Sequence, residues 1–73
     1  MQVTVTFRRI KPSEALKLYA EEKSERLARY LHEPVEVHWV LSVSKIRHIA
    51  SATIVAMGLK IKAEEETEEL YSA

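Results

Sequence analysis

The side chains that could exchange protons or bind a metal near neutral pH are three histidines, His32, His38 and His48. The chain contains no cysteine and no aspartate, and it lacks a glycine-rich phosphate loop, an HExxH pair and a nucleophile elbow. A histidine-dependent hydrolase, the weakest alternative, would need His38 and His48 to face each other across neighbouring strands. Because no cysteine or aspartate accompanies the histidines, surface and helix-capping roles explain them better. We expect no catalytic residue, no metal site and no cofactor.

Two groups of basic residues are stronger candidates for function. The first group, on a predicted helix, is Lys23, Arg26 and Arg29. The second group, in a predicted hairpin, is Lys45, Arg47 and His48. Three residues spaced three apart on a helix spread over about 120° of its surface. A phosphate backbone binds spaced positive charges of this kind, so helix and hairpin together are candidates for RNA binding.

The helical basic group also has a purely structural interpretation. Glu22 and Glu25 precede Arg26 and Arg29 by four residues, the order that favours ion pairs within a helix, at about 0.2–0.5 kcal/mol each. Lys23 lies inside the apolar arc of the helix, where its stem could cover the core while the ammonium reaches water.

Tyr30 and Trp39 likewise allow two interpretations. Together they could form a stacking platform for RNA bases. Trp39, however, shares its strand parity with Val35, Val37 and Leu41, so the pattern favours core packing.

The net charge of zero conceals an uneven distribution. Residues 1–62 contain all 11 Lys and Arg and 6 Glu, a net charge of +5. Residues 63–73 contain the other 5 Glu and no base, a net charge of −5. The first part therefore offers an anion-binding face, and the acidic end suits the start of a helix or a repelling cap.

One long helix must position the first basic group. Residues 13–31 contain no Gly or Pro and are rich in residues that lose little on entering a helix. Ser13, after Pro12, suits the N-cap, and Pro34 follows the end of the helix. At about 100° per residue, the apolar arc collects Leu16, Tyr19, Ala20, Leu27, Tyr30 and Leu31.

Alternating apolar residues predict four strands, at residues 2–8, 35–43, 48–57 and from 59 onward. The third and fourth are joined by a tight Met57–Gly58 turn, because Gly58 can adopt a positive φ. Residues 67–73 resemble the first turns of a second helix. The order β-α-β-β-β(-α) predicts an α+β fold: a four-stranded mixed sheet with its first two strands parallel and one long helix on one face.

A chain of 73 residues makes one domain and buries only about 60% of its unfolded surface. The first residues are too polar for a signal peptide and no apolar run reaches membrane-span length, so we expect a cytoplasmic protein without a membrane partner. One helix about 10 Å across cannot cover four strands, which need roughly 15–20 Å. We therefore expect a homo-oligomer in which a second copy covers the exposed sheet face.

Three stretches in this order carry a resemblance to a known family: MQVTVTF with PSEALKLYAEEKSERLARYL, then VLSVSKIRHIASATI, then KAEEETEELYSA. The second has Lys45, Arg47 and His48 in K-x-R-H positions, and the third has Tyr71 in an aromatic position. Together they span essentially all 73 residues. The chain resembles the ribosome hibernation-promoting and ribosome-associated inhibitor factors, also called sigma-54 modulation proteins.

The resemblance implies a fold similar to double-stranded-RNA-binding domains, in a single domain of residues 1–73 whose C-terminal helix is truncated. It implies binding to small-subunit ribosomal RNA in the messenger and transfer RNA channel, where the factor regulates translation under stress and stabilises idle ribosomes. It also assigns RNA contacts to the basic residues of the first helix. The alternative is a small self-associating protein-interaction module that binds no nucleic acid.

Three positions depart from the family pattern. Ser24 stands where the family usually has a leucine-like residue and Glu65 where it usually has a small one, so we expect both to weaken the core. Met57–Gly58 replaces the usual Asn-Gly type of turn.

Overall fold

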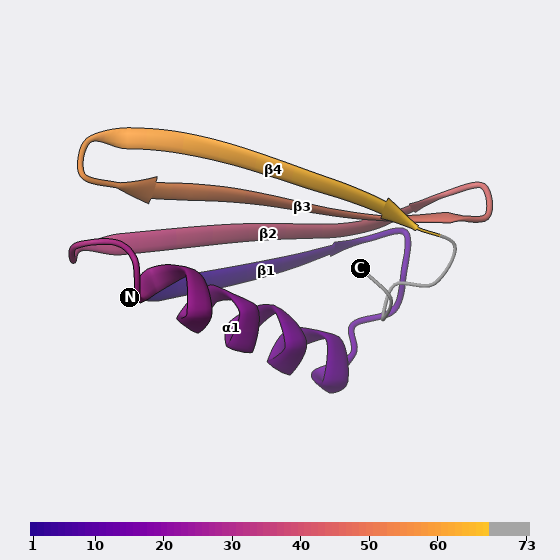
Figure 1. Cartoon of the computed structure of the whole chain (residues 1–73). Coiled ribbons are helices and arrows are strands. Elements are labelled where there is room, and N and C mark those ends of the chain that lie inside the picture. The colour runs from indigo at the N-terminus through magenta and orange to yellow at the C-terminus, as the bar shows by residue number, and fades with distance from the viewer. Residues whose placement is uncertain (68–73) are drawn as a thin grey trace.

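The computed structural model describes residues 1–67; for Glu65 and Thr67 it describes the backbone and not the side chain. Its elements are β1 (Gln2–Arg8), α1 (Glu14–Ala28), β2 (Val35–Ser44), β3 (Arg47–Ala56) and β4 (Leu59–Thr67). Figure 1 shows one helix beneath a long, twisted four-stranded sheet. The predicted α+β class, the number of strands and the single long helix are confirmed.

The sheet has the order β1-β2-β3-β4, with β1 parallel to β2 and the other neighbours antiparallel. This is the predicted pairing, because a crossover through a helix returns the chain parallel and a short hairpin returns it antiparallel. The register places Val5 beside Trp39, Trp39 beside Ala52 and Ala52 beside Ala63. Alternate residues therefore divide the sheet into a face that α1 covers and a bare face.

Helix α1 begins as predicted but ends earlier. Ser13 is the N-cap, and its Oγ accepts a hydrogen bond from the backbone N–H of Leu16 at 3.3 Å. At the other end the amides of Tyr30 and Leu31 donate to carbonyls only three residues back. Such a tightened turn rotates Tyr30 away from the sheet, where it is 86% exposed. The predicted place of Tyr30 on the apolar arc is therefore wrong.

The core lies between α1 and the three strands β1, β2 and β3. Its buried apolar residues are Ala20, Val35, Val37, Trp39, Leu41, Ala52, Ile54 and Ala56. The residues packed against them include Val3, Val5, Phe7, Leu16 and Leu31. The register pairs Trp39 with Ala52 of β3, and this small side chain leaves room for the indole ring.

Ser24 is fully buried in this core, yet it does not leave an unsatisfied polar group. Its Oγ donates to the carbonyl of Ala20 at 2.7 Å and accepts from Nε1 of Trp39 at 2.8 Å. The expectation that Ser24 weakens the core stays a prediction, but its hydroxyl satisfies a buried indole N–H, which a leucine there could not do.

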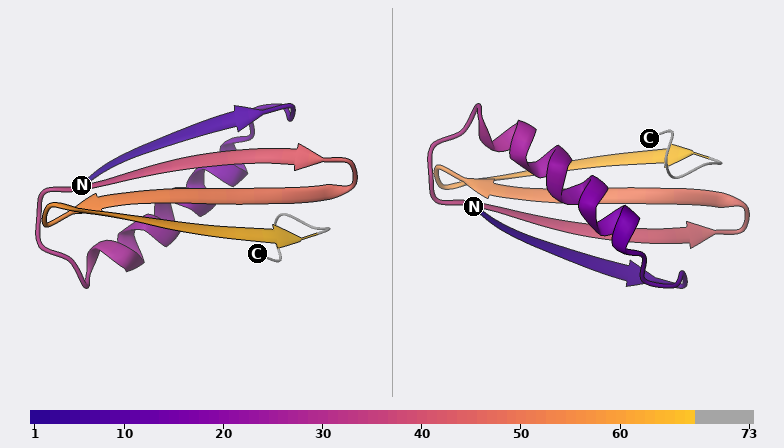
Figure 2. Two further views of the ribbon diagram at one scale, coloured as in Figure 1. Left: turned by 90° about the horizontal axis from the view of Figure 1, so that it is seen from above. Right: turned by 90° about the horizontal axis from the view of Figure 1, so that it is seen from below.

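Helix α1 crosses the sheet diagonally and leaves β4 largely uncovered (Figure 2). Leu59 is 60% exposed and Ile61 47% exposed, although both lie on the helix side of the sheet. The structure thus has the uncovered apolar face that the width of one helix predicted.

Both hairpins have two-residue turns. Met57 and Gly58 have φ of 56° and 74°, as a type I′ turn requires, so the predicted role of Gly58 is confirmed. In the other hairpin, Lys45 has a φ of 59°. Thr67, predicted to open a second helix, instead ends β4, and residues 68–73 of that predicted helix lie outside the described residues.

Candidate nucleic-acid interface

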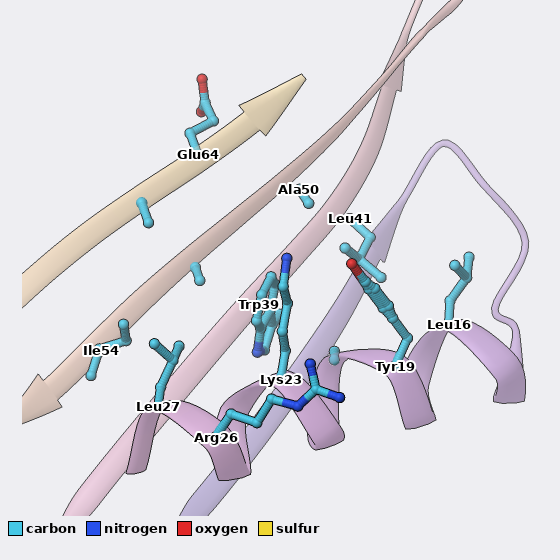
Figure 3. A pocket seen from close by; sticks show the side chains of 13 residues that line it. Leu16, Tyr19, Lys23, Arg26, Leu27, Trp39, Leu41, Ala50, Ile54 and Glu64 are labelled. Atoms are coloured by element: carbon cyan, nitrogen blue, oxygen red, sulfur yellow. The ribbon is translucent and has the colours of Figure 1, made fainter. Parts of the chain in front are cut away.

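Lys23 and Arg26 lie along the side of α1 that borders an apolar groove (Figure 3). Lys23 is half-buried, and its Nζ is 5.4 Å from the centre of the Tyr19 ring, a distance that allows a cation–π contact. Arg26 lines the groove and is exposed. Arg29 is exposed at the C-cap of the helix. Lys23 thus has the partly structural role expected from its place in the apolar arc, whereas the two arginines face water.

The helix ion pairs offered as an alternative explanation are not formed. Within residues 1–67, neither Arg26 nor Arg29 makes a salt bridge to Glu22 or Glu25. Their guanidinium groups therefore have donors to offer to another molecule, and a planar fork of N–H groups suits a phosphate.

The hairpin group is divided between the two faces of the sheet. Lys45 is exposed at the turn, and Arg47 opens β3 on the bare face, beside Ser44. His48 lies beside Val43 on the helix side, where its Nδ1 is buried without a hydrogen-bond partner among the described residues. Lys45 and Arg47 are thus accessible, whereas His48 is partly covered.

The two basic groups lie toward opposite ends of the molecule (Figure 2). The β2–β3 hairpin with Lys45 lies beyond the N-terminal end of α1, and Arg29 lies at the C-terminal end of the helix. The longest dimension of the molecule is 36 Å. One phosphate cannot contact both groups, so an RNA that binds both must extend along the molecule.

The histidines do not form a reaction centre. His38 lies beside Thr53 on the bare face, whereas His48 lies on the helix side, so the proximity that a hydrolase would need is absent. In the part of the chain that the structure describes, no group of three or more His, Cys, Asp or Glu side chains could hold a metal ion.

Trp39 is buried in the core and Tyr30 is exposed, so the two do not form a platform for bases. The core interpretation of Trp39 is confirmed. Sequence reasoning missed its hydrogen bond to Ser24. A signal was present, because a small hydroxyl residue in the apolar arc of a helix is a suitable acceptor for a buried indole N–H.

An apolar groove of about 330 Å³ lies between α1 and strands β3 and β4 (Figure 3). Its floor and walls include Leu27, Trp39, Ile54 and Ala63, and Lys23 and Arg26 stand at its helical side. Among the described helices, α1 is too short and too polar to span a bilayer.

Three bacterial proteins named ribosome hibernation promoting factor are similar to the chain over all of its 73 residues. That of Salmonella typhimurium is 33% identical, and the chain covers 77% of its length. That of Escherichia coli K12 is 32% identical with the same coverage, and that of Azotobacter vinelandii is 32% identical with 68% covered.

Two solved structures have similar folds. The N-terminal domain of Protein Y from Thermus thermophilus superposes with a TM-score of 0.90 at 28% identity, covering all of this chain and 82% of the other. A ribosomal subunit interface protein from Coxiella burnetii superposes with a TM-score of 0.74 at 21% identity, covering 99% of this chain and 79% of the other, a likeness of fold alone.

The family described as Sigma 54 modulation protein / S30EA ribosomal protein matches residues 3–73. This match agrees with the resemblance carried by the first helix and the K-x-R-H hairpin. The chain therefore belongs to the Sigma 54 modulation protein / S30EA ribosomal protein family, whose members are not enzymes.

Proposed function

We propose that this chain is a cytoplasmic, ribosome-associated translation regulator. In this proposal it binds ribosomal RNA of the small subunit in the messenger and transfer RNA channel and stabilises idle ribosomes under stress. The family match over residues 3–73 carries the proposal. The names of the curated relatives, which cover the whole chain, support it.

The RNA-binding residues proposed are Lys23, Arg26, Arg29, Lys45, Arg47 and His48. The exposed guanidinium groups of Arg26 and Arg29, without ion pairs in the described chain, support a contact with phosphates. Phosphate contacts position a protein on RNA but carry no base sequence, so binding should be insensitive to the sequence of a helical target.

The first prediction concerns the helical basic group. Replacing Lys23, Arg26 and Arg29 by Gln should weaken binding to small ribosomal subunits and flatten its salt dependence. Each lost phosphate contact removes about 0.7–0.9 from the slope of log K against log salt, so the slope should fall by about 2. Co-sedimentation with purified small subunits at several salt concentrations measures both quantities.

A matched control removes three other positive charges: Arg8 at the end of β1, and Arg9 and Lys11 in the connection to α1. This variant should change the salt slope less than the helical variant does. A second variant, Lys45→Gln with Arg47→Gln, tests the hairpin separately. Unchanged affinity and slope in the helical variant would reduce that group to a solvated helix surface.

A second candidate function is self-association, and the exposed apolar residues on the helix side of β4 favour it. Leu59, Ile61 and Ala63 are exposed on the helix side of β4. Burying such surface stabilises an assembly by about 25 cal/mol per Å². We propose that the chain forms a homo-oligomer, which sedimentation over a range of protein concentrations tests without any ribosome present.

A further inference from the structure

Strand β4 is an edge strand with an unusual order of charges. It runs from Leu59 to Thr67 and pairs with β3, so its outer backbone groups remain open to another strand. An edge strand of nine residues is a ready template for pairing with a second chain unless its sequence opposes it.

Four of the five charged residues of β4 lie on the bare face, at every second residue, whereas Glu65 lies on the helix side. The four are Lys60, Lys62, Glu64 and Glu66, two positive charges followed by two negative ones. Figure 3 shows the Glu64 side chain pointing away from α1. All four side chains are exposed.

Strand β3 does not neutralise these charges. The residues beside them on β3 are Val55, Thr53, Ser51 and Ile49, none of which is charged. Within residues 1–67 no salt bridge involves any of the four. These four charged side chains can therefore form ion pairs with a partner strand.

We propose that two copies of the chain pair through their β4 edges, antiparallel, about a twofold axis at Ala63. This inference rests on the self-association proposed above, and not on ribosome binding. A twofold axis perpendicular to the sheet keeps the bare faces of both copies on one side. Lys60 then lies opposite the partner's Glu66, and Lys62 opposite the partner's Glu64. Symmetry repeats both pairs, which gives four unlike pairs and no like pair.

The charges select this register against its neighbours. A register shifted by two residues and centred on Lys62 would place that lysine opposite itself. A register centred on Glu64 would do the same for the glutamate. Like charges directly opposite in an antiparallel pair are destabilising, whereas unlike charges stabilise it. The register at Ala63 also places the smallest side chain of the strand at the self-contact.

On the helix side of the sheet, this register places Leu59 opposite Thr67 of the second copy and Ile61 opposite its Glu65. Ile61 would lie diagonally across from the partner's Ala63, within reach of a side-chain contact. The C-terminal end of α1 extends past the β4 edge in projection (Figure 2), so a strand added there would lie over that turn. Leu27 and Tyr30, at this end of the helix, are 38% and 86% exposed.

The other edge of the sheet offers no comparable signal. The bare-face residues of β1 are Gln2, Thr4, Thr6 and Arg8, with one charge among them. No antiparallel self-pairing of β1 would place opposite charges across from each other. Of the two edge strands, β4 is therefore the one whose charges favour pairing with a second copy.

Charge reversal tests the pairing. In the variant Lys60→Glu with Lys62→Glu all four positions are negative, and in Glu64→Lys with Glu66→Lys all four are positive. Each variant alone should dimerise at least about tenfold more weakly than the natural chain, since four unlike pairs become like pairs. Mixed one to one, the two should form a heterodimer with all four pairs unlike. Sedimentation equilibrium from micromolar to sub-millimolar concentration measures all three samples.

Cysteine cross-linking tests the register. The chain has no cysteine of its own, so Ala63→Cys places one thiol at the proposed axis and should yield a covalent dimer under mild oxidation. The matched control Thr4→Cys, on the opposite edge, should form no covalent dimer. Efficient cross-linking of the control with none at Ala63 would assign the contact to β1 and overturn the proposal.

The remaining outcomes separate this inference from the broader ones. A natural chain that is monomeric up to sub-millimolar concentration contradicts self-association and edge pairing together. A natural dimer that neither charge variant weakens contradicts edge pairing alone, and loss of that dimer in Leu59→Thr with Ile61→Thr would assign it to the apolar helix-side surface of β4. Ribosome binding is measured separately and decides none of these results.

Discussion

Ser24 and Trp39 form a polar contact inside the described core that joins the helix to the sheet. Both residues are buried, Ser24 fully, so the indole N–H depends on this acceptor. A buried donor without an acceptor costs about 1–3 kcal/mol, more than the average net value of a hydrogen bond. A residue that departs from the family pattern thus stabilises the particular core in which it lies.

Replacing Ser24 by Ala should lower the free energy of unfolding by about 1–3 kcal/mol, because it leaves the Trp39 N–H unsatisfied. Urea denaturation followed by circular dichroism measures the change. In a Trp39→Phe background the same replacement should cost clearly less, since the donor is already gone. Equal costs in both backgrounds would show that Ser24 acts through helix packing and not through the indole.

At the scale of single residues, the sequence predicted burial better than it predicted contacts. Strand parity assigned Trp39 to the core, and helix periodicity assigned Leu16 and Ala20 to it. The same periodicity failed at Tyr30, because hydrogen bonds to the third residue back end the regular helix before it. Partners such as Ser24 and Trp39 are 15 residues apart, and periodicity within one element carries no information about them.

At the scale of elements, the turn between β3 and β4 stores backbone strain. Met57 has a φ of 56°, in the left-handed region that costs an ordinary L-residue about 1–2 kcal/mol. Gly58 adopts its φ of 74° without that cost, and an added Cβ there would find no atom within 4 Å. The strain therefore lies in one residue of an otherwise suitable turn.

Met57→Asn should raise the free energy of unfolding by about 0.5–1 kcal/mol, since Asn tolerates the left-handed region and Asn-Gly is the favoured pair for this turn. Met57→Ala is the control, because Ala carries the same backbone penalty without the exposed side chain, and it should be nearly neutral. The urea denaturation midpoints of the two variants measure this difference. Equal midpoints would contradict the inference that strain at residue 57 destabilises the turn.

The boundaries of the elements show what local signals can and cannot establish. Ser13 was predicted as the N-cap because its hydroxyl can satisfy a free amide, and the structure agrees. Strand β4, in contrast, continues through three consecutive glutamates to Thr67, where composition favoured the start of a helix. Its pairing with β3 overrides that local preference, and tertiary pairing is not visible in a window of a few residues.

For the whole molecule, the separation of the two basic groups sets the length of a suitable RNA. Helix α1 has 15 residues and is about 22 Å long, and β2 has 10 residues and is about 33 Å long. Each strand of B-DNA carries one phosphate per about 3.4 Å of helix axis, and with a similar rise a duplex RNA of about ten base pairs would reach both groups.

If the proposed RNA contacts are made, affinity for labelled duplex RNA should rise with duplex length and level off near about ten base pairs. Fluorescence anisotropy with a series of lengths measures this. The variant Lys45→Gln with Arg47→Gln should level off at shorter lengths, because the helical group alone remains. The same length dependence in both proteins would contradict simultaneous contact by the two ends.

Trp39 also provides a spectroscopic probe of this architecture. It is the single tryptophan of the chain, it is buried, and its indole donates to a helical residue from the middle of the sheet. Its emission therefore arises from the junction of the two layers and from nowhere else in the protein. Undocking of α1 while the strands stay paired would expose the indole to water and shift that emission, so one unlabelled signal can follow the layers coming apart.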